Sequence, residues 1–272
     1  MINKTLSMGF IFFLLFGSAF LISGEPWIYF NATAFLVVTS GTLGAGLLSS
    51  GPCRIKKALN FASQSYSEDN PNRERKLVDT LMSLGHLHRR HGIINPESVI
   101  DISPVASQGL ELVKDGYSEK EIKEIMGADS QSHALSRREL ERVFRNMASY
   151  APSFGVAGSV IGLVGLLMGI EETSLILKHV PITLVSTLYG IILANFLFLP
   201  VAEKMRQEKE REIRERELIL CAMVNMVRGA DFLKMQRMLN SMVPDAASRV
   251  QDRGAFRRIN TALQEDSAEH KA

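Results

Sequence analysis

Ionisable side chains are missing from the centres of four apolar stretches of this 272-residue chain, although charged residues make up 22% of it. This segregation excludes an ordinary single soluble core, because the apolar stretches have the length of membrane spans. The formal net charge is only +2 and aromatic residues make up 7%, so neither a basic surface nor stacking on bases supports nucleic-acid binding.

Cysteine is scarce as well. Cys53 and Cys221 are the only two, and we expect both to be free thiols in the cytoplasm. No Cys-x-x-Cys pair or His/Cys ligand spacing indicates zinc. His86, His88 and His91 cluster at the end of an expected helix, where imidazoles favour the helix dipole, so we expect no metal site. No nucleophile, acid and base come together and no phosphate loop exists, so we expect neither enzymatic activity nor a cofactor.

Four stretches can span a bilayer, which takes about twenty mostly apolar residues. They run over about residues 6–23, 28–48, 151–170 and 180–201. We interpret the first as an anchor, because no clean signal-peptidase site follows it and another apolar run begins at once.

Basic residues set the orientation of these spans. The short loops 24–27 and 171–179 carry almost none, whereas Arg54, Lys56 and Lys57 follow the second span. Another basic cluster follows the fourth span. By the positive-inside rule, both termini and the long segment 51–150 lie in the cytoplasm.

The sequence therefore predicts an all-α integral membrane protein with four transmembrane helices. Residues 1–50 hold spans 1 and 2, 51–150 a helical cytoplasmic domain, 151–201 spans 3 and 4, and 202–272 a long cytoplasmic C-terminal helix and tail.

Local signals place helices in the cytoplasmic segment. Leucine spacing predicts a helix over 74–91. Ser118 and Glu121 form a capping box that predicts a second helix start. A further helix is expected over 136–150, and the alternating charges after the fourth span predict a solvated helix.

The third span has a stripe of glycine at steps of three and four: Gly155, Gly158, Gly162, Gly165 and Gly169. Because close backbone packing drives helix association in lipid, the stripe predicts that another helix approaches closely. Simple oligomer packing is the plain alternative.

Hydroxyls accompany the small residues in both spans. Ser159 lies beside the glycine stripe, and Ser186, Thr187 and Gly190 lie on a similar stripe of the fourth span. Such hydroxyls either satisfy their own backbone or line a path for an ion. An ion carrier needs an ionisable group in the membrane, so either no ion passes or a partner supplies the carboxylate.

Several segments resemble the MotA/PomA family of flagellar stator proteins. They are YFNATAFLVVTSGTLGAGLLS, LVKDGYSEKEIKEIM, SRRELERVFRNMASYAPSFG, YAPSFGVAGSVIGLVGLL and PITLVSTLYGIILANFLFLPVAEKM, and the resemblance covers most of residues 28–240. It implies a homopentamer in the bacterial inner membrane around two copies of a MotB/PomB-type single-span subunit that carries a membrane aspartate. Passage of H⁺ or Na⁺ to that aspartate would drive rotation against the rotor protein FliG.

The resemblance also assigns roles to residues. It implies partner-helix packing by the glycine stripe and Gly190, and an ion pathway beside Ser159, Ser186 and Thr187. Pro152 and Pro200 match prolines that couple ion flow to conformational change, and the helix is expected to kink at Pro200.

Arg89, Arg90 and Glu97 match rotor-contacting residues, although Asn95-Pro96 replaces the family's Ala-Leu. A helix-dipole contact is the plain alternative for the two arginines. An ExbB/TolQ-like motor subunit and a purely structural membrane protein remain as alternatives for the whole chain.

Overall fold

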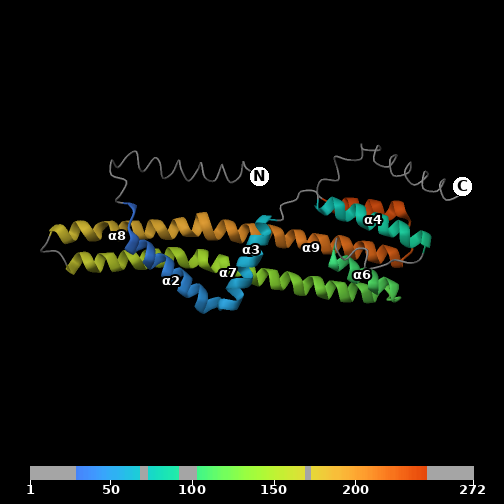
Figure 1. Ribbon diagram of the computed structural model, residues 1–272, viewed down its shortest axis with the longest axis horizontal. Coiled ribbons are helices and arrows are strands. Elements are labelled where there is room, and N and C mark those ends of the chain that lie inside the picture. Colours follow the sequence, from blue (N-terminus) through green and yellow to red (C-terminus); the bar gives the residue numbers. More distant parts are fainter. Residues whose placement is uncertain (1–28, 68–72, 92–102, 169–172, 244–272) are drawn as a thin grey trace, which may run out of the picture. The chain divides into compact units, whose positions relative to one another are not determined.

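The computed structural model describes residues 29–67, 73–91, 103–168 and 173–243, and every element assigned in these ranges is helical (Figure 1). The elements are α2 (Ala32–Ser50), α3 (Pro52–Ser67), α4 (Arg73–His91), α6 (Pro104–Lys114), α7 (Glu119–Met168), α8 (Thr173–Ile192), the π-helix η2 (Leu193–Phe198), α9 (Leu199–Val227) and α10 (Phe232–Met242).

Three helical stretches among the described residues are long and apolar enough to cross a membrane: Ala32–Ser50, part of Glu119–Leu167 and part of Thr183–Val227. They correspond to the second, third and fourth predicted spans. The first predicted span, over 6–23, lies outside the described residues. The loop predicted over 171–179 is wrong from Thr173 on, because α8 already begins there. Lys178 and His179 have ordinary helix propensities and do not stop a helix.

The chain forms two compact units, which α7 and α9 both enter. Unit 1 comprises Met1–Ser67 and Arg138–Gln207, and unit 2 comprises Glu68–Arg137 and Glu208–Ala272. Helix α3 and residues 138–150 pack with the apolar helices of unit 1, and the division into membrane and cytoplasmic segments stays a prediction.

Helix α7 begins as its sequence predicts. The Ser118 amide donates to Glu121 Oε2 at 2.9 Å, and the Glu121 amide donates to Ser118 Oγ at 3.4 Å, which confirms the capping box. The helix expected over 136–150 is present and continues into the third span, but the break expected before it is wrong, because α7 runs unbroken for 50 residues. Gly127 is a weak breaker that costs a helix only about 1 kcal/mol, and Pro152 lies inside the helix.

Unit 1 has a core where α3 meets α7, η2 and α9. Phe61 of α3 is 2% exposed and clusters with Phe144 and Met147 of α7 and with Phe198 and Met205. Helix α2 packs against α8, and Tyr189 of α8 donates to the Tyr29 carbonyl at 2.5 Å. This bond fastens the start of α2 to α8.

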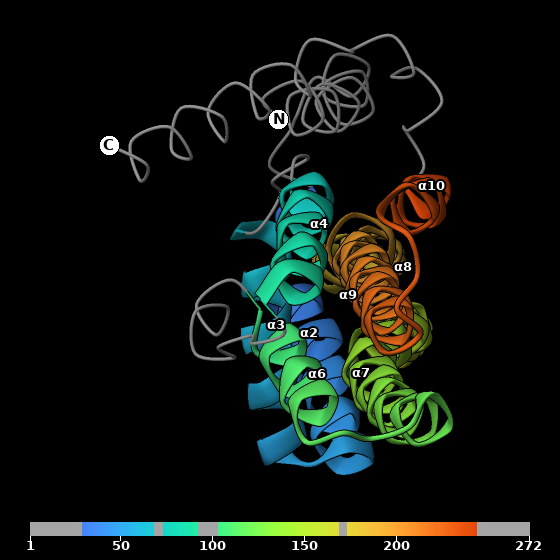
Figure 2. The ribbon, with the colours of Figure 1, turned by 90° about the vertical axis from the view of Figure 1, so that its right-hand side faces the viewer.

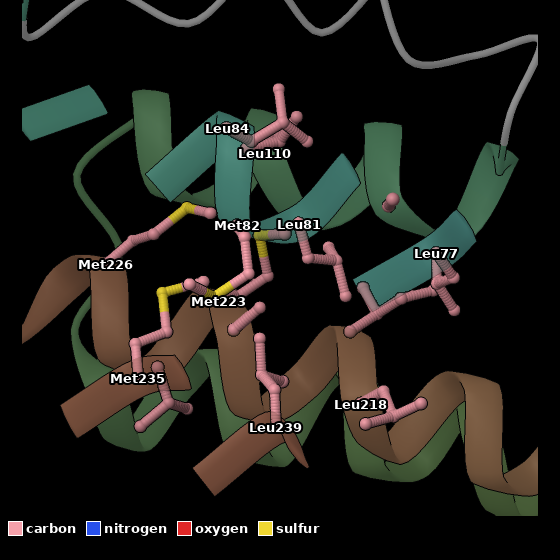
Figure 3. Packing of buried hydrophobic residues seen from close by; sticks show 14 of the residues in the cluster. Leu77, Leu81, Met82, Leu84, Leu110, Leu218, Met223, Met226, Met235 and Leu239 are labelled. Atoms are coloured by element: carbon pink, nitrogen blue, oxygen red, sulfur yellow. The ribbon is translucent and has the colours of Figure 1, made fainter. Parts of the chain in front are cut away.

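The core of unit 2 is rich in leucine and methionine. Helices α4, α6, α7, α9 and α10 surround it (Figure 2). Figure 3 shows Leu81, Met82, Met223, Met235 and Leu239 interlocking in its centre. Flexible methionine side chains fill the irregular gaps between these helices.

The prediction that the charged part of α9 is fully solvated is wrong. Glu208 and Glu215 are 6% and 9% exposed. Arg73 of α4 pairs with both, at 3.7 Å and 3.0 Å. Arg137 of α7 donates twice to Glu212, at 2.8 Å and 2.7 Å. Alternating charge does not distinguish a solvated helix from one that is paired with its neighbours.

Candidate functional site

Four glycines lie where α7 and α8 approach each other closely. A Cβ on Gly155 would lie 3.1 Å from the Ser186 carbonyl oxygen, and a Cβ on Gly190 would lie 2.6 Å from the Ala151 carbonyl oxygen. A Cβ on Gly162 would lie 2.8 Å from the Thr183 amide, and Gly158 faces Ser186. The absence of side chains is therefore what lets the two backbones touch.

The close helix approach predicted from the stripe thus occurs within the chain, between the third and fourth predicted spans. Gly165 is half-buried, and Gly169 lies outside the described residues. A sequence stripe shows that a groove exists but cannot identify the helix that fills it. Contact of these glycines with a second protein stays a prediction.

The three predicted ion-pathway hydroxyls meet at the same interface. Ser159 Oγ lies 2.6 Å from the Thr183 carbonyl oxygen and 2.6 Å from Thr187 Oγ1. Because Ser159 has a single hydroxyl hydrogen, donation to the carbonyl leaves it to accept from Thr187. Ser186 is fully buried and donates to the Gly155 carbonyl at 3.0 Å.

These hydroxyls therefore satisfy backbone groups and at the same time form a short polar chain inside an apolar interface. The described parts of the three apolar stretches, 32–50, 151–167 and 183–202, contain no Asp, Glu, Lys or Arg. The interface can offer oxygen atoms to an ion or a proton, but a titrating group must come from elsewhere.

Each proline lies where an apolar stretch meets a charged one. Pro152 lies at the start of the apolar part of α7, and Pro200 lies at the start of α9, after the apolar run of α8 and η2. Pro152 is inside α7, and α9 continues through Pro200 as predicted. Immediately before Pro200 the helix widens into η2, where the Leu199 amide donates to the Ala194 carbonyl five residues back. A π-helical turn at this point was not predicted, and it adjusts the hydrogen-bond ladder to a residue that lacks an N–H.

Of the predicted rotor-contact residues, the structure describes the side chain of Arg89 alone. It is exposed and pairs with Asp231, at the start of α10, at 2.7 Å. The Arg90 side chain and Glu97 lie outside the described residues.

Sequence reasoning missed the ion pairs that join α7 to α9. Arg228 donates to Glu119 Oε2 at 2.6 Å and Lys123 lies 2.5 Å from the same carboxylate. The hydrogen bonds from Arg228 and Lys123 lower the pKa of Glu119 to about 2. No local pattern links residues more than a hundred positions apart, so the sequence held no signal for this contact.

Comparison with known proteins finds a matching family model and relatives that align with most of this chain. Residues 100–218 match the MotA/TolQ/ExbB proton channel family. The uncharacterized protein YtxD of Bacillus subtilis is 31% identical over 223 residues, which cover 81% of this chain and 80% of YtxD. Motility protein A of the same bacterium is 26% identical over 201 residues, which cover 73% and 74%.

A solved structure has the same fold. The chain matches a chain of the flagellar MotAB stator complex from Bacillus subtilis with a TM-score of 0.80 and 23% identity, over 91% of this chain and 98% of that one.

Proposed function

The chain belongs to the MotA/TolQ/ExbB proton channel family, and from this premise we propose that it is the torque-generating stator subunit of a bacterial flagellar motor. In this role it turns around a MotB/PomB-type single-span partner as H⁺ or Na⁺ passes. The proposed role includes no enzymatic reaction and no cofactor.

One observation carries this proposal. The bonded hydroxyls of Ser159 and Thr187 lie at an apolar interface whose described spans hold no ionisable residue. Interhelical hydroxyls also serve packing in a structural protein, but an ion path without a titrating group of its own needs one from outside. A partner that brings a carboxylate explains both features.

We further propose four transmembrane helices in the inner membrane with both termini in the cytoplasm. The first helix is the stretch over residues 6–23. Five copies would form the ring, as the family resemblance implies. The exposed apolar side chains of α7 suit contacts with lipid or neighbouring copies; they are Val156, Val160, Ile161, Leu163, Val164 and Leu167.

The coupling would run from the membrane interface to the cytoplasmic unit. Neutralising a partner's carboxylate lowers its desolvation cost in the membrane, which lets the surrounding helices repack. Pro152 and Pro200 lie at the ends of the repacking segments, and α7 and α9 continue from them into unit 2. Arg89, Arg90 and Glu97 would then press on FliG.

The decisive experiment is ion flux in proteoliposomes that contain the chain and its partner. An imposed H⁺ or Na⁺ gradient should collapse, with K⁺ as the inactive control. Replacing the partner's membrane aspartate by asparagine should stop the flux. Equal flux from the asparagine variant would refute the proposal, because the titrating group would then belong to this chain.

An ExbB/TolQ-like role makes a different topological prediction. Proteins of that kind have three spans, which would place residue 1 in the periplasm. If the stator proposal is correct, a reporter that works only in the cytoplasm should be active when it is fused to residue 1. A reporter that works only in the periplasm should be inactive at the same position.

A further inference from the structure

Helix α3 has a surface that no step of the proposed mechanism uses. It follows α2 after Gly51, whose φ of +73° turns the chain sharply. Figure 1 shows α3 crossing α7 instead of running alongside it. Under the membrane placement proposed above, a short helix that crosses the spanning α7 runs closer to the plane of the membrane than to its normal.

The depth of α3 follows from its contacts. Its buried residues Ala58 and Phe61 cluster with Ala151 of α7 and with Phe198 and Ala202 around Pro200. These positions are where the apolar parts of α7 and α9 meet their charged parts. Helix α3 therefore lies at the cytoplasmic boundary of the membrane, given the membrane placement proposed above.

The exposed surface of α3 has two unlike flanks. Leu59 and Tyr66 are 55% and 49% exposed and stand two turns apart on one flank. Lys57, Asn60 and Gln64 follow helical spacing on the other flank, and all three are exposed. The helix thus offers an apolar side and a polar side next to its buried one.

Two basic side chains add positive charge to this surface: Lys56 lies between the two flanks and Lys57 lies on the polar flank, and both are exposed. Arg54 pairs with Glu139 at 3.3 Å, but within the described ranges no carboxylate pairs with Lys56 or Lys57. Exposed ammonium groups at the cytoplasmic membrane boundary attract anionic headgroups.

We propose that α3 is an interfacial helix that binds anionic phospholipids of the cytoplasmic leaflet. The Leu59 and Tyr66 flank enters the acyl-chain region, and Lys56 and Lys57 hold the lipid phosphates. Lipid bound there anchors the helix that packs on the segments next to Pro152 and Pro200.

The orientation is tested in nanodiscs on the full chain with its partner. Nitroxides are placed by Leu59→Cys, Tyr66→Cys, Asn60→Cys and Gln64→Cys, after Cys53→Ala and Cys221→Ala. Positions 59 and 66 should collide mainly with oxygen, and positions 60 and 64 mainly with a water-soluble nickel chelate. Equal water accessibility on both flanks would overturn the interfacial placement.

The lipid preference is tested by native mass spectrometry with phosphatidylglycerol and phosphatidylcholine. Each basic side chain near an anionic surface contributes about fivefold in affinity, so K56Q/K57Q should lower phosphatidylglycerol binding roughly 25-fold. The control K234Q/R237Q removes the same charge from α10 and should bind like the wild type. An equal loss of phosphatidylglycerol binding in both variants would show that binding depends only on the net charge of the protein, and it would overturn the inference.

Free inorganic phosphate serves as a competitor. It should not displace the lipid, because the apolar flank contributes to binding; displacement at millimolar phosphate would reveal a simple anion site and contradict the proposal. Ion flux measured on the same samples separates the two ideas. Flux without lipid selectivity refutes this inference alone, and lipid selectivity without flux refutes the stator function alone.

Discussion

The Ser159 hydroxyl lies 2.6 Å from the Thr187 hydroxyl, across the interface between α7 and α8. Because Ser159 also lies 2.6 Å from the Thr183 carbonyl oxygen, the three groups form a directed chain of hydrogen bonds. An ion that uses these oxygens must compete with bonds that hold the two helices together. The proposed ion path would therefore couple ion passage to helix packing at this point.

Thr187→Val tests this coupling with a side chain of nearly the same shape. Ser159 would lose its donor but keep its bond to the Thr183 carbonyl, so the complex should still assemble. One interhelical hydrogen bond in a membrane contributes about 0.6 kcal/mol to stability. We expect ion flux to fall roughly five- to tenfold in the proteoliposome assay.

Thr39→Val is the matched control, because the Thr39 hydroxyl donates to the Phe35 carbonyl of its own helix and not across the α7–α8 interface. Wild-type flux in Thr187→Val would show that the hydroxyl pair serves packing alone.

Gly190→Ala should destabilise the α7–α8 interface. The added Cβ would lie 2.6 Å from the Ala151 carbonyl oxygen and 3.1 Å from the Gly155 Cα, and backbone atoms cannot move aside cheaply. We expect a loss of about 1–3 kcal/mol, seen as a lower unfolding temperature in detergent. Gly44→Ala, where nothing lies within 4 Å of the added Cβ, should leave that temperature unchanged or raise it.

Leu239→Ala should release α10 from unit 2. Leu239 is fully buried in the leucine–methionine core, so truncation should cost about 2–5 kcal/mol of unfolding free energy. Limited proteolysis should then cleave α10 faster. Leu233→Ala on the same helix is the control, since Leu233 is 57% exposed. Similar cleavage of the two variants would contradict the packing.

Glu215→Gln should change stability in a pH-dependent way. Burial raises the pKa of Glu215, and Arg73 and Arg211 oppose that rise. A carboxyl with a raised folded-state pKa loses stability as pH rises from the unfolded value, about 4.3, through the folded one. The variant should therefore unfold at a higher temperature than the wild type at pH 8, with the gain vanishing towards pH 4.5.

Glu217→Gln, an exposed neighbour on α9, should show no such trend. A lower unfolding temperature for Glu215→Gln at pH 8 would mean that pairing with Arg73 outweighs burial.

Sequence patterns predicted the features that depend on neighbouring residues. The helix over 74–91 and the capping box of Ser118 are of this kind, and so is the apolar character of 32–50. The hydroxyls of Ser159 and Thr187, which the sequence places on or beside stripes of small residues, lie next to each other in the structure, and their role in ion passage stays a prediction. The unbroken α7 was missed, since weak breakers such as Gly127 yield to packing in a long helix.

Contacts between distant segments could not be predicted. The pairs of Arg73 with Glu215 and of Arg228 with Glu119 depend on which helices become neighbours, and charge alternation does not specify that. For the same reason the helix that fills the glycine groove became clear only in three dimensions. Local spacing fixes a face of a helix, whereas its neighbour is fixed by the whole fold.

Pro200→Ala should reshape the helix where α8 passes into α9. The wild-type chain uses the π-helical turn η2, in which the Leu199 amide bonds to the Ala194 carbonyl. An alanine at 200 restores an N–H and removes the ring that clashes with the carbonyl four residues back. The turn can then convert to an α-helix, which rotates the following helix by about 100° per residue of register shift.

We expect slower hydrogen exchange over 193–200 and a loss of flux or torque while the complex still assembles. Pro152→Ala is the comparison, because Pro152 sits in α7 without a π-helical turn and its removal shifts no register. Unchanged exchange in Pro200→Ala would show that packing around Phe198, and not the proline, maintains η2. In that case the coupling assigned to Pro200 would have to reside in the core where α3 meets η2 and α9.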